Sequence, residues 1–318
     1  MKDFLPGVGS MALLVADKVS VWRGTGAGRR QVVREVSLQV ARGELFGLLG
    51  PNGAGKTSLV SVLSGLEPPG AGGVWLEGVP LSRARAGRVG LAPQELAFYG
   101  NLTGRENLEF VGQLYGLAGQ ALRSRVDELL ASVGLEDAAN RPANTYSGGM
   151  QRRLNLALAL VSDPAILYLD EPTVGVDPQS RNLLFEQVRT WNAAGLTIVY
   201  ISHYMEEVRE LCPRIAIMDH GQVVACDRVD TLLAREKGIL RAQVEGEVSP
   251  EWSGRLGMTL LGEENGWTSW ISAEPAQTAP ELVRLAEQAG CRVRRLETRP
   301  ADLQQVFLGL TGHALRDE

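Results

Sequence analysis

The chain has 318 residues, of which 44% are hydrophobic and 22% are charged, so it is long enough for one large core and a smaller second unit. Its 32 basic and 37 acidic side chains leave a formal net charge of -5, which gives the whole surface no electrostatic reason to bind nucleic acid. The 3 cysteines have no metal-ligand spacing, so they predict neither a disulfide framework nor a zinc site and fit a reducing cytosol.

The sequence predicts no membrane-spanning helix, because it contains no run of about 18 apolar residues. Its N-terminal residues also lack the flanks and the apolar length of a secretory signal. We expect the residues up to Ser10 to be a lead-in, with either Met1 or Met11 as the start of translation.

The first part of the chain predicts two antiparallel strands, then a strand, a loop and a helix. Residues 13–22 and 32–40 alternate apolar and polar side chains and are separated by a loop at 24–30 that is rich in Gly and Arg. A buried strand at 44–49 then leads into a glycine-rich loop, after which a helix begins at Thr57.

The middle of the chain alternates between helical and strand patterns. Residues 101–134 carry apolar side chains at helical spacing, and so do residues 151–161. A short apolar run at 166–169 is typical of a buried strand in a parallel sheet. Further strands are expected at 197–201, 215–219 and 222–225.

The composition shifts after about residue 231 toward Glu, Gly, Ser and Trp, which predicts a domain boundary near Arg235. We therefore expect two domains, residues 11–234 and residues 235–318. In the second domain we expect strands at 240–244, 258–261, 267–272 and 292–297, and helices at 280–289 and from residue 301.

The loop after the strand at 44–49 reads Gly-Pro-Asn-Gly-Ala-Gly-Lys-Thr and fits the phosphate-loop pattern. Its small residues let backbone N–H groups surround phosphates at a helix N-terminus. We expect Lys56 to reach the β- and γ-phosphates, the Thr57 hydroxyl to ligate Mg²⁺, and Ser58 to touch the α-phosphate. The residues expected to bind ATP here are Gly50, Asn52, Gly53, Ala54, Gly55, Lys56, Thr57 and Ser58.

Two acidic residues follow the apolar run at 166–169. Asp170 ends a buried strand, where phosphate-loop enzymes hold their Mg²⁺ coordination shell, and Glu171 comes next. A second carboxylate beside the metal polarises an attacking water, so we assign Asp170 to the metal and Glu171 to the general base. Alone, the pair would read as two solvated acids at a strand end.

The sequence Tyr-Ser-Gly-Gly-Met-Gln at 146–151 resembles the signature of ABC ATPases. Ser147, Gly148 and Gly149 match that motif, whereas Tyr146 replaces its usual Leu and Met150 its usual Gln, departures that exporter branches of the family also show. A Ser hydroxyl with two unhindered N–H groups at a helix start is a second anion site. The alternative is a simple helix cap followed by a flexible turn.

The resemblance extends over about residues 13–225 and assigns further roles. Gln94 resembles the residue that senses metal and water and is counted with the Mg²⁺ site, Asp177 the loop that crosses to an opposing subunit, and His203 the switch histidine that contacts the γ-phosphate. Trp22 stands where the family has a Tyr that stacks on adenine, although a half-buried strand aromatic is the alternative.

The resemblance implies an α/β fold, a P-loop NTPase ABC nucleotide-binding domain with a RecA-like core, an antiparallel β subdomain and an α-helical subdomain, followed by a small α+β C-terminal domain. It also implies an ATP-hydrolysing subunit that uses ATP and Mg²⁺. One phosphate loop and one signature require a head-to-tail dimer with a second copy or a homologous chain. No nucleic acid is expected as a partner.

The tail at 299–312 resembles the C-terminal extension of drug- and antibiotic-exporter ATPases of the daunorubicin-resistance type. This implies a separate integral-membrane permease, with coupling helices received near residues 101–134 with help from Glu95 and Tyr99, and a place on the cytoplasmic face of the cell membrane. The alternatives are a soluble ABC ATPase that acts on nucleic acid or ribosomes, and an importer ATPase. The sequence leaves the exported compound and the composition of the dimer open.

Overall fold

The computed structural model describes residues 12–84, 86–234 and 236–311, so Met1, Met11 and Arg235 lie outside the described residues. The chain separates into two compact units, with the division between Cys226 and Asp227. The boundary expected near Arg235 stays a prediction.

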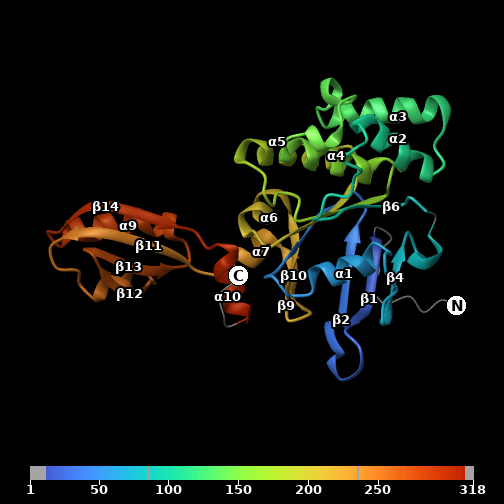
Figure 1. Ribbon diagram of the computed structural model, residues 1–318. Helices are drawn as coiled ribbons and strands as arrows, with labels where there is room; N and C mark the ends of the chain where they lie inside the picture. Colours follow the sequence, from blue (N-terminus) through green and yellow to red (C-terminus); the bar gives the residue numbers. More distant parts are fainter. Residues whose placement is uncertain (1–11, 85, 235, 312–318) are drawn as a thin grey trace. The chain divides into compact units, whose positions relative to one another are not determined.

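An antiparallel sheet opens the first unit, with its strands in the order β2-β1-β4-β5. Its long strands β1 and β2 coincide with the two alternating stretches predicted from the sequence, and they pair in antiparallel register with Val19 opposite Val36. A 3₁₀ turn lies in the loop between them (Figure 1). The strands are β1 (Ala12–Arg23), β2 (Arg30–Ala41), β4 (Ala71–Leu76) and β5 (Val79–Pro80).

A six-stranded sheet in the order β10-β9-β3-β8-β7-β6 forms the centre of the unit. The strand pairs β9-β3, β3-β8, β8-β7 and β7-β6 are parallel, so the carboxyl ends of these strands lie along one edge. The central strands are buried on both faces, as their continuous apolar runs predict. The strands are β3 (Leu45–Leu49), β6 (Val89–Ala92), β7 (Ile166–Asp170), β8 (Thr197–Ser202), β9 (Arg214–Asp219) and β10 (Gln222–Arg228).

Helix α1 (Lys56–Leu63) packs between the two sheets. Its residues Leu59, Val60, Val62 and Leu63 share one buried cluster with side chains of β1, β2, β3 and β8. Burial of a single leucine of this kind stabilises a fold by about 1.5–3 kcal/mol relative to exposure. The phosphate loop, which joins β3 to α1, is therefore anchored at both ends by the main core.

Further helices pack against the parallel sheet, and one group of them lies near β6 (Figure 1). The predicted helical stretch at 101–134 forms two helices, because Gly116 and Gly119 adopt positive φ and interrupt it. Two helices that the sequence analysis did not anticipate, α5 and α6, connect the later strands. The helices are α2 (Gly104–Leu114), α3 (Gly119–Ser132), α4 (Gly148–Leu160), α5 (Pro178–Ala193) and α6 (Met205–Leu211).

The second unit contains a four-stranded antiparallel sheet in the order β12-β13-β11-β14 and four helices in its described part. The fully buried ring of Trp270 packs in its core with Trp252 and with Leu282 of α9. Helix α9 begins five residues earlier than predicted, with Pro275 in its first turn, where proline is favoured. Pro280, at which the predicted helix began, therefore lies inside it. The elements are α7 (Val229–Leu233), β11 (Gly238–Glu245), α8 (Glu251–Arg255), β12 (Thr259–Glu264), β13 (Trp267–Ser272), α9 (Pro275–Gln288), β14 (Arg292–Arg299) and α10 (Leu303–Thr311).

The three cysteines differ in their surroundings. Cys212 lies buried at the end of α6, and burial raises the pKa of its thiol. Cys226 is exposed on β10, and Cys291 is partly exposed just before β14. None of the described helices combines the length and the apolar character needed to cross a lipid bilayer.

Candidate active site

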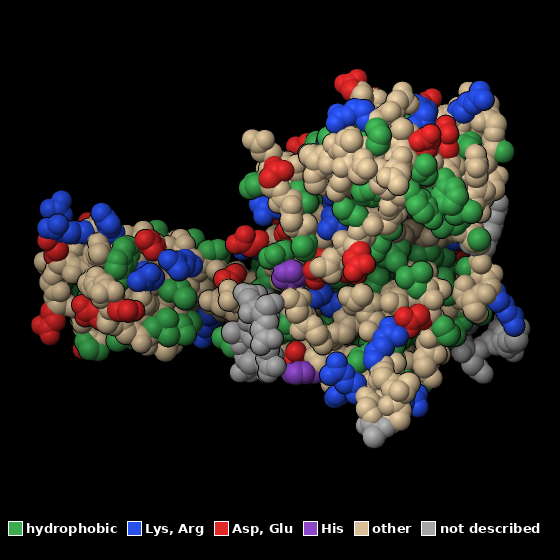
Figure 2. All heavy atoms as spheres, viewed as in Figure 1, with side chains coloured by type: hydrophobic (Ala, Val, Ile, Leu, Met, Phe, Trp, Pro, Cys, Tyr) green, Lys and Arg blue, Asp and Glu red, His purple; other side chains and the backbone are tan. Residues whose placement is uncertain are grey.

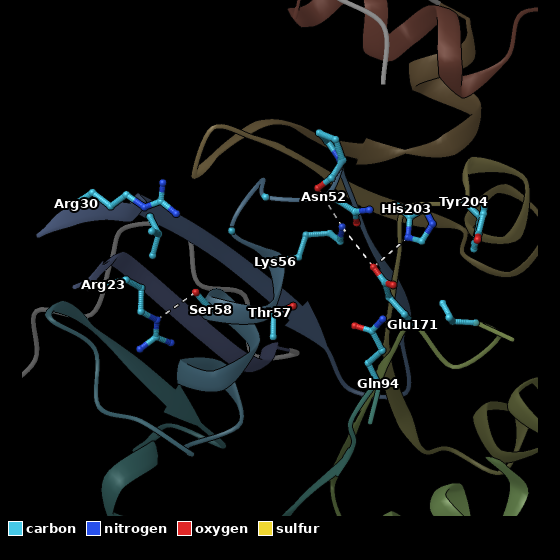
Figure 3. A pocket seen from close by; sticks show the side chains of 15 residues that line it. Arg23, Arg30, Asn52, Lys56, Thr57, Ser58, Gln94, Glu171, His203 and Tyr204 are labelled. Atoms are coloured by element: carbon cyan, nitrogen blue, oxygen red, sulfur yellow. Dashed lines mark hydrogen bonds and ion pairs between the residues drawn. The ribbon is translucent and has the colours of Figure 1, made fainter. Parts of the chain in front are cut away.

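A pocket of about 590 Å³ lies at the carboxyl edge of the parallel sheet. It brings together residues that are far apart in the sequence: the phosphate loop after β3, Gln94 after β6, Glu171 after β7, and His203 after β8. Figure 3 shows these side chains pointing toward one another. The lining residues from the phosphate loop and the start of α1 are Pro51, Asn52, Gly53, Gly55, Lys56, Thr57 and Ser58.

The phosphate loop depends on glycine at two tight positions. Gly55 caps α1 with a left-handed φ of 100°, and a Cβ there would lie 2.5 Å from the carbonyl oxygen of Val32. A Cβ on Gly50 would collide with the carbonyl oxygen of Met218. Both glycines therefore let the backbone pass close to neighbouring strands. Gly50 and Ala54, two of the expected binding residues, are buried behind the pocket lining.

Lys56, Glu171 and His203 form the centre of the pocket. The Lys56 ammonium lies 3.7 Å from Glu171 Oε1, and His203 Nδ1 lies 3.0 Å from the same oxygen. The ammonium also donates to the carbonyl oxygen of Gly50 at 2.7 Å. Burial lowers the pKa of Lys56, and the negative charges of Glu171 and Asp170 oppose that shift. The three predicted side chains are thus within reach of one another.

Glu171 has an unusual backbone conformation. Its φ of 47° lies in the left-handed region, which a residue with a side chain occupies at a cost of about 1–3 kcal/mol. Its backbone N–H donates to the carbonyl oxygen of Ile201 at 2.9 Å. The adjoining strand therefore helps to hold the carboxylate at the sheet edge, where it faces the pocket.

Asp170 lies beneath Glu171 and does not line the pocket directly. Its side chain is almost fully buried. Burial, together with the negative charge of Glu171, raises its pKa to about 6, against the opposing effect of Lys56 and Arg152. Additional positive charge at this edge of the sheet would therefore be electrostatically favourable.

The pocket also contains residues that the sequence analysis missed. Arg23, at the end of β1, places its Nε 3.4 Å from the Ser58 hydroxyl and pairs with Glu67. Arg30 and Tyr204 also line the pocket (Figure 3). The signal for the two arginines was present, because Arg23 precedes the Gly- and Arg-rich loop at 24–30 and Arg30 ends it. They place positive charge on the same side of the pocket as the phosphate loop.

The structure does not bring Trp22 into this pocket. The guanidinium carbon of Arg29 lies 5.3 Å from the centre of its ring, within the range of a cation–π contact. The ring also lies so close to Gly70 that a Cβ at that position would be 2.5 Å from it. Stacking of Trp22 on adenine therefore stays a prediction.

The signature residues lie outside the pocket. Ser147 caps α4, where its hydroxyl accepts a hydrogen bond from the Met150 N–H at 3.3 Å. Ser147 and Gly148 are exposed. Tyr146 is buried and donates its phenolic hydrogen to the carbonyl oxygen of Ala138 at 2.7 Å, so the residue that departs from the usual motif anchors the turn.

Asp177 also lies away from the pocket and caps α5. Its carboxylate accepts hydrogen bonds from the N–H groups of Gln179 and Ser180, each at 3.0 Å. The bonds with Ser180 and Gln179 lower the pKa of Asp177. Its structural role is therefore clear, and its expected contact with an opposing subunit stays a prediction.

Comparison with known proteins identifies similar sequences. The sequence profile described as "ABC transporter" matches residues 33–174. The linearmycin resistance ATP-binding protein of Bacillus subtilis is 38% identical over 300 residues, which cover 91% of this chain and 96% of the relative. A Nod factor export ATP-binding protein I of Burkholderia orbicola is 40% identical over 297 residues, covering 91% of this chain and 95% of the relative.

The fold is also similar to solved structures. One is the dimeric structure of an ATP-binding cassette in a post-hydrolysis state, bound to ADP and Pi. It superposes with a TM-score of 0.62 over 68% of this chain and 98% of that chain, at 24% sequence identity. At that level of identity the comparison shows a shared fold and no more.

Proposed function

Because this chain belongs to the ABC transporter family as an ATP-binding subunit that hydrolyses ATP, we propose that it powers export through a separate membrane permease. The predicted family, fold class and ATP hydrolase activity are confirmed. One observation carries the export proposal: relatives named for resistance and for export match 91% of this chain. This share is larger than the share of the chain that belongs to the first unit. The similarity therefore includes the C-terminal unit.

The geometry supports a distinct role in ATP hydrolysis for each of the pocket's charged residues. The backbone N–H groups of the phosphate loop and the Lys56 ammonium bind the phosphates of ATP. Glu171 orients the attacking water and accepts its proton, and His203, at 3.0 Å from Glu171, holds this carboxylate and contacts the γ-phosphate. Arg30 adds positive charge that favours the binding of an anionic nucleotide, whereas the charge of Arg23 is paired with Glu67.

The same edge of the sheet fits Mg²⁺, because it offers oxygen ligands of the kind that this cation prefers. Thr57 supplies a hydroxyl, Gln94 an amide oxygen and Asp170 a carboxylate. Burial, together with the negative charge of Glu171, raises the pKa of Asp170 to about 6, and a divalent cation beside it would favour its ionised form. When bound, the cation offsets the charge that develops on the phosphates.

The exposed signature supports a head-to-tail dimer. Ser147 and Gly148 are exposed and present a hydroxyl and backbone N–H groups at the start of α4, yet they line no part of their own chain's pocket. We assign them, with Gly149 and Asp177, to the nucleotide bound in the pocket of a second copy or of a homologous chain.

Aromatic side chains at the start of the helical group suit the docking of a permease. The rings of Tyr99 and Phe110 meet edge to face at 5.3 Å beside a cavity of about 430 Å³. Both rings are exposed, as are Leu96, Leu114 and Tyr115. Figure 2 shows hydrophobic side chains grouped on this helical part of the surface. Contiguous apolar surface of this kind marks interaction sites, and a docked permease would place the chain at the cytoplasmic face of the membrane.

The test is capture of the tagged chain from detergent-solubilised membranes, followed by mass spectrometry. We expect a multi-helix membrane protein in stoichiometric amount. The variant Phe110→Asp should lose this partner while the isolated subunit keeps its ATPase activity, because Phe110 lies outside the pocket. The matched control Leu261→Asp, also at an exposed apolar residue, should retain the partner. Ribosomal or DNA-bound partners without a membrane protein would overturn the proposal.

A further inference from the structure

Helix α4 (Gly148–Leu160) holds two buried polar side chains, Arg152 and Asn155, that face the loops of the active site. Arg152 is 6% exposed and Asn155 is 2% exposed. They lie three residues apart, so both project from the same face of the helix.

The guanidinium group of Arg152 joins two loops that no other described side chain connects in this way. Its Nη1 donates to the carbonyl oxygens of Gln94 at 2.8 Å and Pro93 at 3.3 Å. Its Nη2 donates to the carbonyl oxygens of Glu171 at 3.3 Å and Val174 at 3.4 Å. The rigid, planar fork of arginine can span two loops, whereas the ammonium of lysine is a single point.

Asn155 reinforces one of these two attachments. Its side-chain oxygen accepts from the Ala97 N–H at 2.9 Å, and its amide nitrogen donates to the Pro93 carbonyl oxygen at 3.1 Å. The loop that carries Gln94 is therefore fixed to α4 on both sides of that residue. The loop that carries Glu171 is attached to α4 through Arg152.

Burying the charged guanidinium of Arg152 is energetically unfavourable, so this position requires hydrogen bonds that offset the loss of water. Burial lowers the pKa of its guanidinium, and the charges near it, including those of Asp170 and Glu171, oppose that shift. A hydrogen bond from a charged donor is stronger than one between neutral groups, and a buried carbonyl left without a donor loses that compensation. The two loops thus depend on this one side chain for several backbone contacts.

We propose that Arg152 is a positioning residue for ATP hydrolysis, which sets the places of Gln94 and Glu171 relative to each other by tying both backbones to helix α4. The inference rests on the roles proposed above for Gln94 and Glu171. Arg152 does not line the pocket in which nucleotide would bind. It acts through the carbonyl groups of the residues that do. A displacement of about 1 Å at a reacting group can reduce turnover by about 10²-fold.

The test compares Arg152→Gln and Arg152→Lys with the wild type in steady-state ATPase assays and in equilibrium binding of ATP. We expect Arg152→Gln to reduce kcat by roughly 10- to 100-fold and to change the Kd for ATP by less than about threefold. Arg152→Lys keeps a charged donor and should recover part of the lost kcat. If Arg152→Gln does not fold, Arg152→Lys is the test variant. It is expected to show a reduced kcat at an unchanged Kd for ATP.

Arg153, the next residue, provides a matched control. It donates to the carbonyl oxygens of Val133 at 2.7 Å and Gly134 at 3.0 Å, which belong to the end of α3 and not to the active-site loops. Arg153→Gln should therefore lower the Tm while keeping kcat within about twofold of the wild type.

Two results would overturn the inference. One is a kcat for Arg152→Gln that matches that of Arg153→Gln. The other is a parallel loss of ATP binding and kcat in both Arg152 variants, without recovery in Lys, which would make the residue a general structural support. A Glu171→Gln variant that hydrolyses ATP as fast as the wild type would instead refute the proposed role of Glu171, so the two failures are distinguishable.

Discussion

At the scale of single residues, the two neighbouring carboxylates of the site experience different surroundings. Glu171 faces the pocket and has Lys56 and His203 as partners, whereas Asp170 is buried behind it. Burial and the charge of Glu171 raise the pKa of Asp170 to about 6. The two adjacent carboxyl groups therefore differ in their electrostatic surroundings. When Asp170 is ionised, it destabilises the nucleotide-free protein.

This difference predicts a pH effect on folding. Because the pKa of Asp170 is higher in the folded protein than in the unfolded chain, the folded state binds more protons between pH 4 and 6 or so, and its stability falls as the pH rises through that window. The upper limit of the effect at neutral pH is about 3 kcal/mol. Urea unfolding of the wild type and Asp170→Asn, without nucleotide or Mg²⁺, should show the wild type losing free energy of unfolding relative to the variant between about pH 4 and 6. A difference that stays constant with pH would contradict the shift.

At the scale of elements, helix starts place the functional residues. Ser147 caps α4 and Asp177 caps α5, so each residue assigned to a second subunit also stabilises the start of a helix. A hydroxyl or carboxylate cap contributes about 0.5–2 kcal/mol compared with alanine. The structural and functional roles of such a residue therefore have to be separated by experiment.

Two substitutions separate them for Asp177. Asparagine caps helices as well as aspartate does, whereas alanine removes the acceptor for the N–H groups of Gln179 and Ser180. We expect Asp177→Ala to lower the free energy of unfolding by about 0.5–2 kcal/mol and Asp177→Asn to leave it nearly unchanged. If the carboxylate acts across a dimer, ATP turnover should fall in both variants. Normal turnover in Asp177→Asn would restrict the residue to its capping role.

At the scale of the whole molecule, the signature residues do not line the pocket of their own chain, so ATP becomes the link between two copies. The phosphate loop and Glu171 lie in the pocket, while Ser147 and Gly148 lie on exposed surface of the same unit. Bound ATP would thus be held by both chains, and its hydrolysis would release them.

The variant Glu171→Gln tests this link. We expect it to bind ATP like the wild type, to lose about 10²–10⁴-fold in turnover because the general base is absent, and to accumulate as a dimer with ATP in sedimentation experiments. Adding Ser147→Glu, which places a negative charge where the partner's nucleotide is expected, should return the protein to a monomer. A dimer that forms without ATP, or persists with Ser147→Glu, would argue against a nucleotide held between the signature and the phosphate loop.

The sequence predicted the parts of this site that local pattern controls. The spacing of Gly50 to Thr57 requires a strand, a loop and a helix, and the carboxyl-edge position of Asp170 follows from the apolar run before it. Helix α5 was also predictable, because Asp177-Pro178 is a typical N-cap and first-turn pair, but the pattern was not used.

Other features depend on contacts between distant segments. Arg152 donates to carbonyl groups 58 and 19 residues away, and a backbone carbonyl has no signature in the sequence. The position of Trp22 beside Arg29 and Gly70, outside the pocket, likewise results from packing of the loop at 24–30 and of the segment before β4. Such long-range arrangements require the folded chain.

The different surroundings of the three thiols make the native chain suitable for site-selective labelling. Thiolates attack maleimide reagents as nucleophiles, so buried Cys212, whose pKa is raised, should react far more slowly than exposed Cys226. Replacing the partly exposed Cys291 with serine would then leave Cys226 as the one readily accessible thiol among the cysteines. A fluorophore or spin label attached there would report the separation of two copies during an ATP cycle, without any cysteine having to be introduced.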